Sequence, residues 1–134
     1  MRESMVAFAV STPLSFSAAL ERARQALAAE GFGVLTEIDV QATMKKKLDV
    51  DGEPYVILGA CHPPSAHRAL RLAPEVGVFL PCNVTVSVEG GTTVVRAMNP
   101  AAALGVVGKP ELAAVGEEVG AALRRVVAAC AGDS

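Results

Sequence analysis

The stretch from residue 53 to residue 88 constrains the fold of this 134-residue chain more than any other part of it. Its run from Tyr55 to Ala60 is almost continuously apolar, which is typical of a strand buried on both faces. Pro63 and Pro64 favour the start of a short helix, because proline suits the first helical position. A second long strand is expected at residues 78–88. Both histidines and two of the three cysteines lie in this stretch, so any chemical site is expected here.

Hydrophobic periodicity and turn residues place the other elements around this stretch. Apolar residues at helical spacing between Ser15 and Gly31 predict a helix that the serine caps and the glycine ends. Two glycines at residues 89–92 predict an antiparallel hairpin. The expected order is β-α-β-(α)-β-α-β-β-α-α, with strands at 5–10, 32–39, 55–60, 78–88 and 93–98, and helices at 16–30, 40–48, 63–73, 100–105 and 110–130. Residues 1–134 are therefore expected to form a single α+β domain, a mixed sheet with helices packed on it.

Composition and charge exclude several classes of protein. Hydrophobic residues make up 51% of the chain and charged residues only 19%, which excludes a disordered protein. The net charge is −2, and the only basic run is Lys45 to Lys47, so we expect no nucleic-acid partner. No apolar run is long enough for a membrane span, so we expect no membrane partner either. An odd number of cysteines, three, fits free thiols in a reducing cytoplasm.

Four sequence blocks together resemble one family. They are Gly-Phe-Gly-Val-Leu-Thr-Glu-Ile-Asp at 31–39, the apolar strand ending at Cys61, the Pro64 helix, and Gly-Val-Phe-Leu-Pro-Cys-Asn-Val at 77–84. This set is similar to the small bacterial and archaeal proteins of the domain of unknown function 302 family. The resemblance spans about residues 5–129 and implies a compact, stand-alone cytosolic α+β protein that forms homodimers, with no established activity.

The resemblance also bears on two short motifs. Pro81-Cys82-Asn83 matches the family pattern directly. Members of the family commonly have Cys-Asn-Pro where this chain has Cys61-His62-Pro63, so the histidine is a departure.

One set of residues has the side chains that metals prefer. Thiolate and imidazole are the usual ligands of zinc, and Cys61, His62, His67 and Cys82 could supply both. Their spacing matches no known zinc module. The alternative is that the two histidines are satisfied or exposed at a helix N-terminus, without a metal.

The same residues also permit thiol chemistry. Cys61 precedes an expected helix N-terminus, which lowers the pKa of a thiol, and His62 could act as its base. Cys82 on a neighbouring strand could pair with Cys61 as a reversible disulfide. Against this, Cys61 closes an apolar strand, and cysteine is among the most buried residue types.

The leading interpretation is a homodimeric module that binds a small ligand or a partner protein. Its expected pocket lining is Cys61, His62, Pro81, Cys82 and Asn83. The runner-up is a thiol-dependent enzyme or redox sensor that uses Cys61 and Cys82, and the third hypothesis is zinc binding. No phosphate-loop or dinucleotide motif occurs, so no cofactor is expected and no catalytic residue is assigned.

Overall fold

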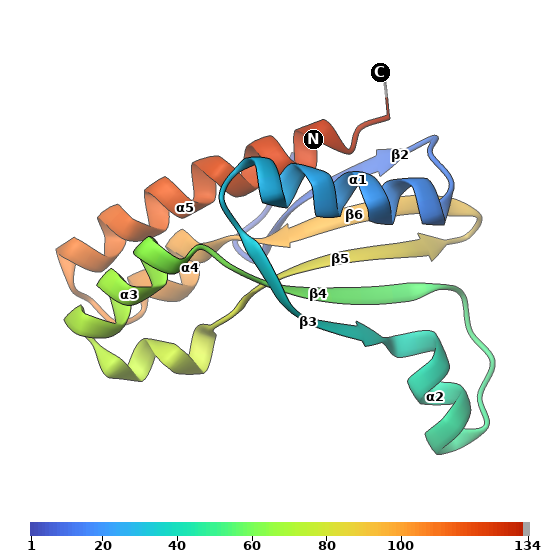
Figure 1. Ribbon diagram of the computed structural model, residues 1–134, viewed down its shortest axis with the longest axis horizontal. Helices are drawn as coiled ribbons and strands as arrows, with labels where there is room; N and C mark the ends of the chain where they lie inside the picture. The colour runs from blue at the N-terminus through green and yellow to red at the C-terminus, as the bar shows by residue number, and fades with distance from the viewer. Residues whose placement is uncertain (133–134) are drawn as a thin grey trace.

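A six-stranded sheet covered on one face by two long helices forms the body of the protein (Figure 1). The computed structural model describes residues 1–132. The sheet has the strand order β1-β2-β6-β5-β4-β3. The strands are β1 (Arg2–Glu3), β2 (Ala7–Thr12), β3 (Gly33–Asp39), β4 (Tyr55–Cys61), β5 (Cys82–Glu89) and β6 (Thr92–Met98). The helices are α1 (Phe16–Ala29), α2 (Val40–Leu48), α3 (Pro63–Leu72), α4 (Pro100–Gly105) and α5 (Pro110–Ala129), with a 3₁₀ helix, η1, at Pro74–Phe79.

The predicted α+β class is confirmed, but the expectation of a mixed sheet is wrong. All five strand pairings are antiparallel. Neither α2 nor α3 carries the chain back over the sheet, so β4 and β5 each return antiparallel beside the strand before them (Figure 1). Among the helices that connect two strands in the described chain, only α1 crosses the sheet; it connects β2 to the far edge strand β3, which is not its neighbour.

The local signals in the sequence act as expected at the helix ends and the hairpin. The Ser15 side chain accepts a hydrogen bond from the backbone N–H of Ala18, 3.1 Å away, and so caps α1. Gly31 follows α1 with a φ of +82°, which residues with a side chain rarely adopt. Gly90 and Gly91 take positive φ values in the turn between β5 and β6.

The second long strand begins later than the sequence predicts. Residues 78 and 79 belong to η1, and β5 starts only at Cys82. Pro81 stands directly before the strand, after a cis Leu80–Pro81 peptide bond. A proline cannot donate a hydrogen bond to a neighbouring strand, which explains why the ladder starts one residue after it.

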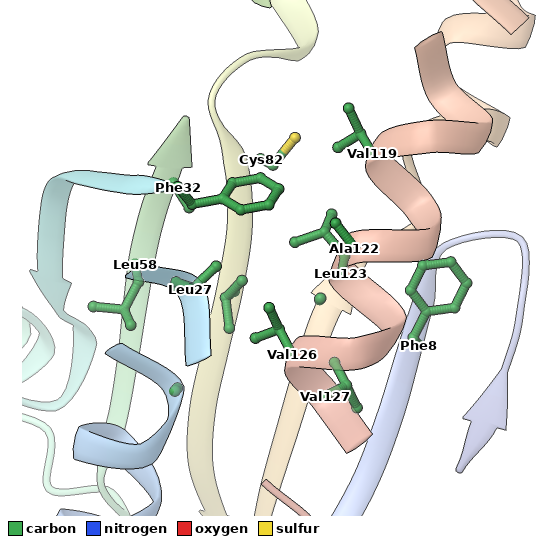
Figure 2. Close-up of a cluster of buried hydrophobic side chains, with 14 of the residues drawn as sticks. Phe8, Leu27, Phe32, Leu58, Cys82, Val119, Ala122, Leu123, Val126 and Val127 are labelled. Atoms are coloured by element: carbon green, nitrogen blue, oxygen red, sulfur yellow. The ribbon is translucent and has the colours of Figure 1, made fainter. Parts of the chain in front are cut away.

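The core lies between the sheet and the two long helices (Figure 2). Phe8 of β2 and Leu58 of β4 project from the sheet and are fully buried. Leu27 of α1 and Leu123 of α5 belong to the same core cluster and are equally buried. The opposite face of the sheet has no covering helix within the described chain, as Figure 1 shows.

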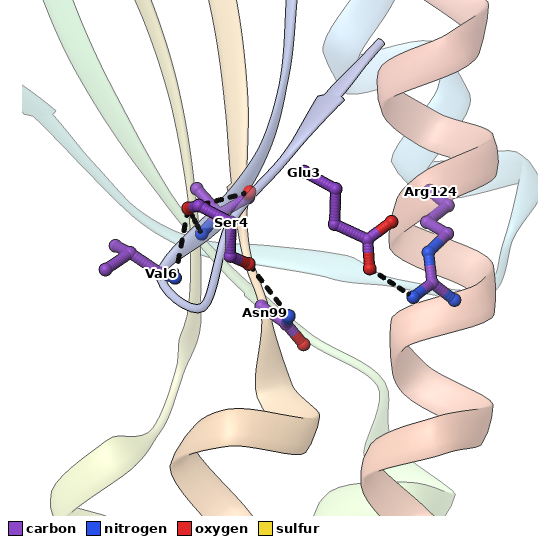
Figure 3. A network of polar contacts seen from close by, with 6 residues as sticks. Glu3, Ser4, Val6, Asn99 and Arg124 are labelled. Carbon is purple, nitrogen blue, oxygen red and sulfur yellow. Dashed lines mark hydrogen bonds and ion pairs between the residues drawn. The ribbon is translucent and has the colours of Figure 1, made fainter.

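The N-terminal strand is tied to the body by polar contacts (Figure 3). The Asn99 side chain donates a hydrogen bond to the backbone carbonyl of Ser4 over 3.1 Å. The backbone N–H of Asn99 donates to the backbone carbonyl of Val6. Glu3 of β1 pairs with Arg124 of α5 at 2.7 Å. These contacts fix the start of α4, because Asn99 is its N-cap residue.

A glycine lets α4 pack closely against α5. A Cβ atom at Gly116 would lie only 2.9 Å from the Cα of Ala101 in α4, closer than side chains normally approach. Gly120, one turn further along α5, has ordinary room, since its Cβ would lie 3.8 Å from Pro100. The close approach at Gly116 places α4 beside the pocket described next. Along residues 1–132, no helix combines the length and apolar character that crossing a membrane requires.

Candidate functional site

A pocket of about 290 Å³ opens where β4 ends and α3 begins. Three alanines with short side chains, Ala60, Ala66 and Ala69, leave the space that larger residues would fill. Exposed apolar side chains, among them Leu70 and Phe79, stand at its solvent side. The full lining is Leu35, Ala60, Cys61, His62, Ser65, Ala66, Ala69, Leu70, Phe79, Leu80, Pro81, Cys82, Met98, Pro100, Leu104, Val115 and Val119. Nearly all of this surface is carbon, with two thiols and a single polar pair.

Four of the five sequence-predicted pocket residues line this one pocket. Cys61, His62, Pro81 and Cys82 come together because β4 and β5 pair with Ala60 opposite Cys82. Asn83 does not line it. Side chains alternate along a strand, so Asn83 lies opposite Gly59 and is exposed on the other face from Cys82.

Gly59 allows the Pro81 ring to lie over β4. A Cβ atom at Gly59 would come within 2.9 Å of the Pro81 Cγ and within 2.1 Å of the Thr36 Oγ1. A side chain at this position would therefore clash with Thr36 and crowd the Pro81 ring, so that one of these neighbours would have to shift. The conformation of the wall thus depends on a residue that the sequence pattern alone marks only as part of a strand.

The polar pair of the pocket is His62 with Ser65. The His62 Nδ1 lies 2.7 Å from the Ser65 Oγ, in the first turn of α3. The imidazole packs against the Phe32 ring at a centroid distance of 5.4 Å and a tilt of 52°. The Cδ2–Nε2 edge faces Gly31, where a Cβ atom would lie 3.4 Å away. The ring is therefore held in place by contacts on three sides.

The three thiols are free and differ in accessibility. Burial, together with the nearby Cys61, raises the pKa of the Cys82 thiol to about 11. Burial likewise raises the pKa of Cys130, in α5, to about 11. Both thiols stay protonated at neutral pH, and a protonated thiol is a poor nucleophile. Cys61 is half-buried and is the accessible thiol of the pocket.

The arrangement does not support the zinc hypothesis. His67 points away from the pocket and is exposed on α3, beside Arg68 and Arg71. Among residues 1–132, no three His, Cys, Asp or Glu side chains lie together in a way that could hold a metal ion. Of the four candidate zinc ligands, three line the pocket: Cys61, His62 and Cys82.

Sequence reasoning missed the side of the pocket formed by α4 and α5. Leu104, Val115 and Val119 form part of the lining. Val115 and Val119 lie on the apolar stripe of α5, but the stripe alone does not distinguish residues beside a pocket from residues in a filled core. The glycine at position 116, which permits the close approach of another helix, is the sequence feature that points to this region.

The comparisons with known proteins agree with this fold. The domain of unknown function DUF302 matches residues 8–130 of the chain. The crystal structure of an uncharacterized conserved protein DUF302 from Bacillus stearothermophilus is 31% identical in sequence, and the match covers 95% of this chain and 99% of that one with a TM-score of 0.88. No curated protein matches the chain. The chain therefore belongs to the DUF302 family.

Proposed function

We propose that this chain is a homodimeric module that binds a small apolar ligand in the pocket between β4, α3, α4 and α5. The observation that carries the proposal is the pocket itself, about 290 Å³ with a lining that is almost entirely apolar. Ligand pockets are mostly apolar, with a few placed polar groups, and this one has that composition. The free thiols are consistent with action in the cytoplasm.

The chemistry of the lining favours binding over catalysis. Leu104 and Val119 offer only dispersion contacts, and the Cys82 thiol stays protonated at neutral pH. An apolar cavity binds water poorly and takes up apolar molecules instead; a cavity of about 150 Å³ lined by apolar residues accepts benzene. The pocket here is about twice that size, so it can take a molecule of roughly ten non-hydrogen atoms.

Calorimetric titration with 1-octanol tests the ligand part of the proposal. At about 0.5 kcal/mol for each of its nine or so non-hydrogen atoms, binding releases about 4.5 kcal/mol, which corresponds to a Kd near 0.5 mM. We expect saturable binding of one octanol per chain in that range. Heat that rises linearly, without saturation, to the solubility limit of octanol would contradict the proposal.

The uncovered sheet face supports the homodimer. Ile57 of β4 alternates with core residues and so faces this side, opposite Thr85 of β5. Arg96 and Glu89 on the adjacent strands neutralise one another at 2.9 Å. The hydrogen bonds from Arg96, and then from Ser87, lower the pKa of Glu89 to about 2, so the pair stays ionised at neutral pH.

A sparsely charged face suits a second copy of the same chain better than a strongly charged partner. Five strands about 4.8 Å apart and six residues long present roughly 500 Å² in plan, the order of size of one side of a standard interface. The segment that follows β3, residues 40–52 (called the arm below), adds apolar surface to this area. Its helix α2 has no buried residue, and Met44 and Leu48 are exposed on it. A nine-residue helix is marginal by itself in water, so packing against a partner would stabilise α2.

Sedimentation equilibrium tests the homodimer. The chain has a mass of 13.7 kDa, so we expect about twice that value at micromolar concentration. Ile57→Glu places a charge on the uncovered face and should give the monomer mass with an unchanged circular dichroism spectrum. Ser17→Glu, an exposed position on α1, is the matched control and should remain dimeric. A wild-type monomer at micromolar concentration would contradict this part of the proposal.

A further inference from the structure

We infer that the ligand of the pocket is amphipathic, with an apolar chain or ring and a carboxylate head that accepts a hydrogen bond from His62. The inference rests on the proposed function and names the chemical class of the ligand. Its basis is the distribution of polar groups. His62 and Ser65 lie three residues apart at the start of α3 and form the polar end of the lining, whereas the other lining side chains end in carbon or sulfur.

One ring nitrogen of His62 has no hydrogen-bond partner within residues 1–132. Nδ1 is engaged with the Ser65 Oγ at 2.7 Å, whereas Nε2, on the ring edge that lies beside Gly31, is unpaired there. A wholly apolar ligand would cover His62 and take water away from Nε2, which carries a free-energy cost that a polar head avoids. The pocket therefore favours a ligand with a hydrogen-bonding group at this end.

The partner of Nδ1 indicates that the head is an acceptor. Ser65 is buried, and His62 Nδ1 is the partner of its hydroxyl group in the described chain. We assign the hydroxyl as the donor to Nδ1, which leaves the proton of the neutral ring on Nε2 as a donor. A protonated ring would also donate from Nε2. In both forms of the ring the matching group on a ligand is an acceptor.

The charges around the pocket are compatible with a negatively charged head group on the ligand. Of the described residues that line the pocket, none is Asp or Glu, so no carboxylate of the protein opposes that of the ligand. The Cys82 thiol is protonated at neutral pH and adds no negative charge. A carboxylate that accepts from Nε2–H forms a charge-assisted hydrogen bond, which is stronger than one with a neutral acceptor.

The size of the pocket sets the length of the ligand. At about twice the volume of a cavity that holds benzene, 290 Å³ suits roughly ten non-hydrogen atoms. Octanoate has about that size, and 1-octanol has the same chain without the carboxylate. The two compounds therefore isolate the contribution of the head group.

The experiment is a pair of calorimetric titrations, octanoate and 1-octanol, on the full chain at neutral pH. We expect the wild-type protein to bind octanoate at least about tenfold more tightly than octanol. His62→Leu should lose this preference and bind the two compounds about equally. The substitution removes the contact with Ser65 but no side-chain cap bond of α3, and circular dichroism checks that the variant is folded. Ser65→Ala should reduce the preference, because the tautomer of His62 is then no longer fixed.

A conservative variant separates hydrogen bonding from shape. His62→Gln keeps a side-chain N–H donor, so it should retain a measurable preference for octanoate, which His62→Leu lacks. Equal binding of both compounds by the wild type, or an unchanged octanoate preference in His62→Leu, would overturn the inference and leave the apolar binding function standing. Failure of the wild type to bind either compound would overturn both.

Discussion

Replacing Phe8 with alanine is expected to lower the free energy of unfolding by about 3–5 kcal/mol. Phe8 is 0% exposed and lies between β2 and α5, as Figure 2 shows. The guanidinium group of Arg124 lies over the ring, 4.6 Å from its centroid, and Gly120 packs near the ring edge. The substitution removes these contacts and leaves a cavity in the core. Since small proteins are stable by only about 5–15 kcal/mol, this is the largest stability loss we expect from one side chain.

Urea unfolding followed by circular dichroism measures the change. Phe79→Ala is the matched control, because Phe79 is 38% exposed and lies at the solvent side of the pocket rather than in the core. It should lower the free energy of unfolding by less than about 1 kcal/mol. Equal losses for the two variants would show that the core does not depend on Phe8 as described.

Replacing Ala66 with phenylalanine is expected to weaken octanol binding by at least about thirtyfold, or about 2 kcal/mol. Ala66 lies on α3, is half-buried and lines the pocket. The added ring needs the space that a benzene molecule needs, about half of the 290 Å³ that is open. The ring therefore fills the space that the ligand would otherwise occupy, and the loss should appear in calorimetric titration.

The neighbouring residue supplies the control for this variant. His67 is exposed on the same helix and does not line the pocket, so His67→Phe adds the same ring outside it. This variant should bind octanol as the wild type does. If both variants bind normally, octanol does not occupy the pocket.

Local signals predicted most of the elements, since the features that define them lie within a few residues. The Ser15 cap, the positive φ of Gly31 and the two-glycine hairpin turn all depend on chain geometry over one turn. The arm helix α2 was expected at residues 40–48 and lies there. β1 was not predicted, because two residues that pair with β2 carry no periodic pattern.

Long-range arrangement was less accessible to the sequence. The path of α3 and η1 decides whether β5 returns parallel or antiparallel to β4, and no residue pattern in the chain encodes that path. The strand expected from residue 78 was misjudged because Val78 and Phe79 are apolar, although both are exposed. Apolar character indicates burial only on average, and Phe79 lies at the solvent side of the pocket instead.

The candidate site could be predicted in part. Cys61 and His62 follow a strand that was expected to be central, Pro81 and Cys82 were expected within the second long strand, and all four line the pocket. Their role in binding a ligand stays a prediction. Asn83 was grouped with them only by sequence proximity, and strand alternation turns it to the other face. The α4 and α5 side of the pocket requires the close helix contact at Gly116, which depends on residues distant in sequence.

The most direct test of the central claim is a measurement of nuclear Overhauser effects between 1-octanol and the methyl groups of the protein. The account predicts contacts from the octanol chain to the methyl groups of Leu104 and Val119, which lie on the α4 and α5 side of the pocket. Leu48 and Val50, exposed apolar residues on the arm, should show none. Contacts to the arm with none to Leu104 and Val119 would show that octanol binds to surface apolar residues, and would contradict a binding function for the pocket.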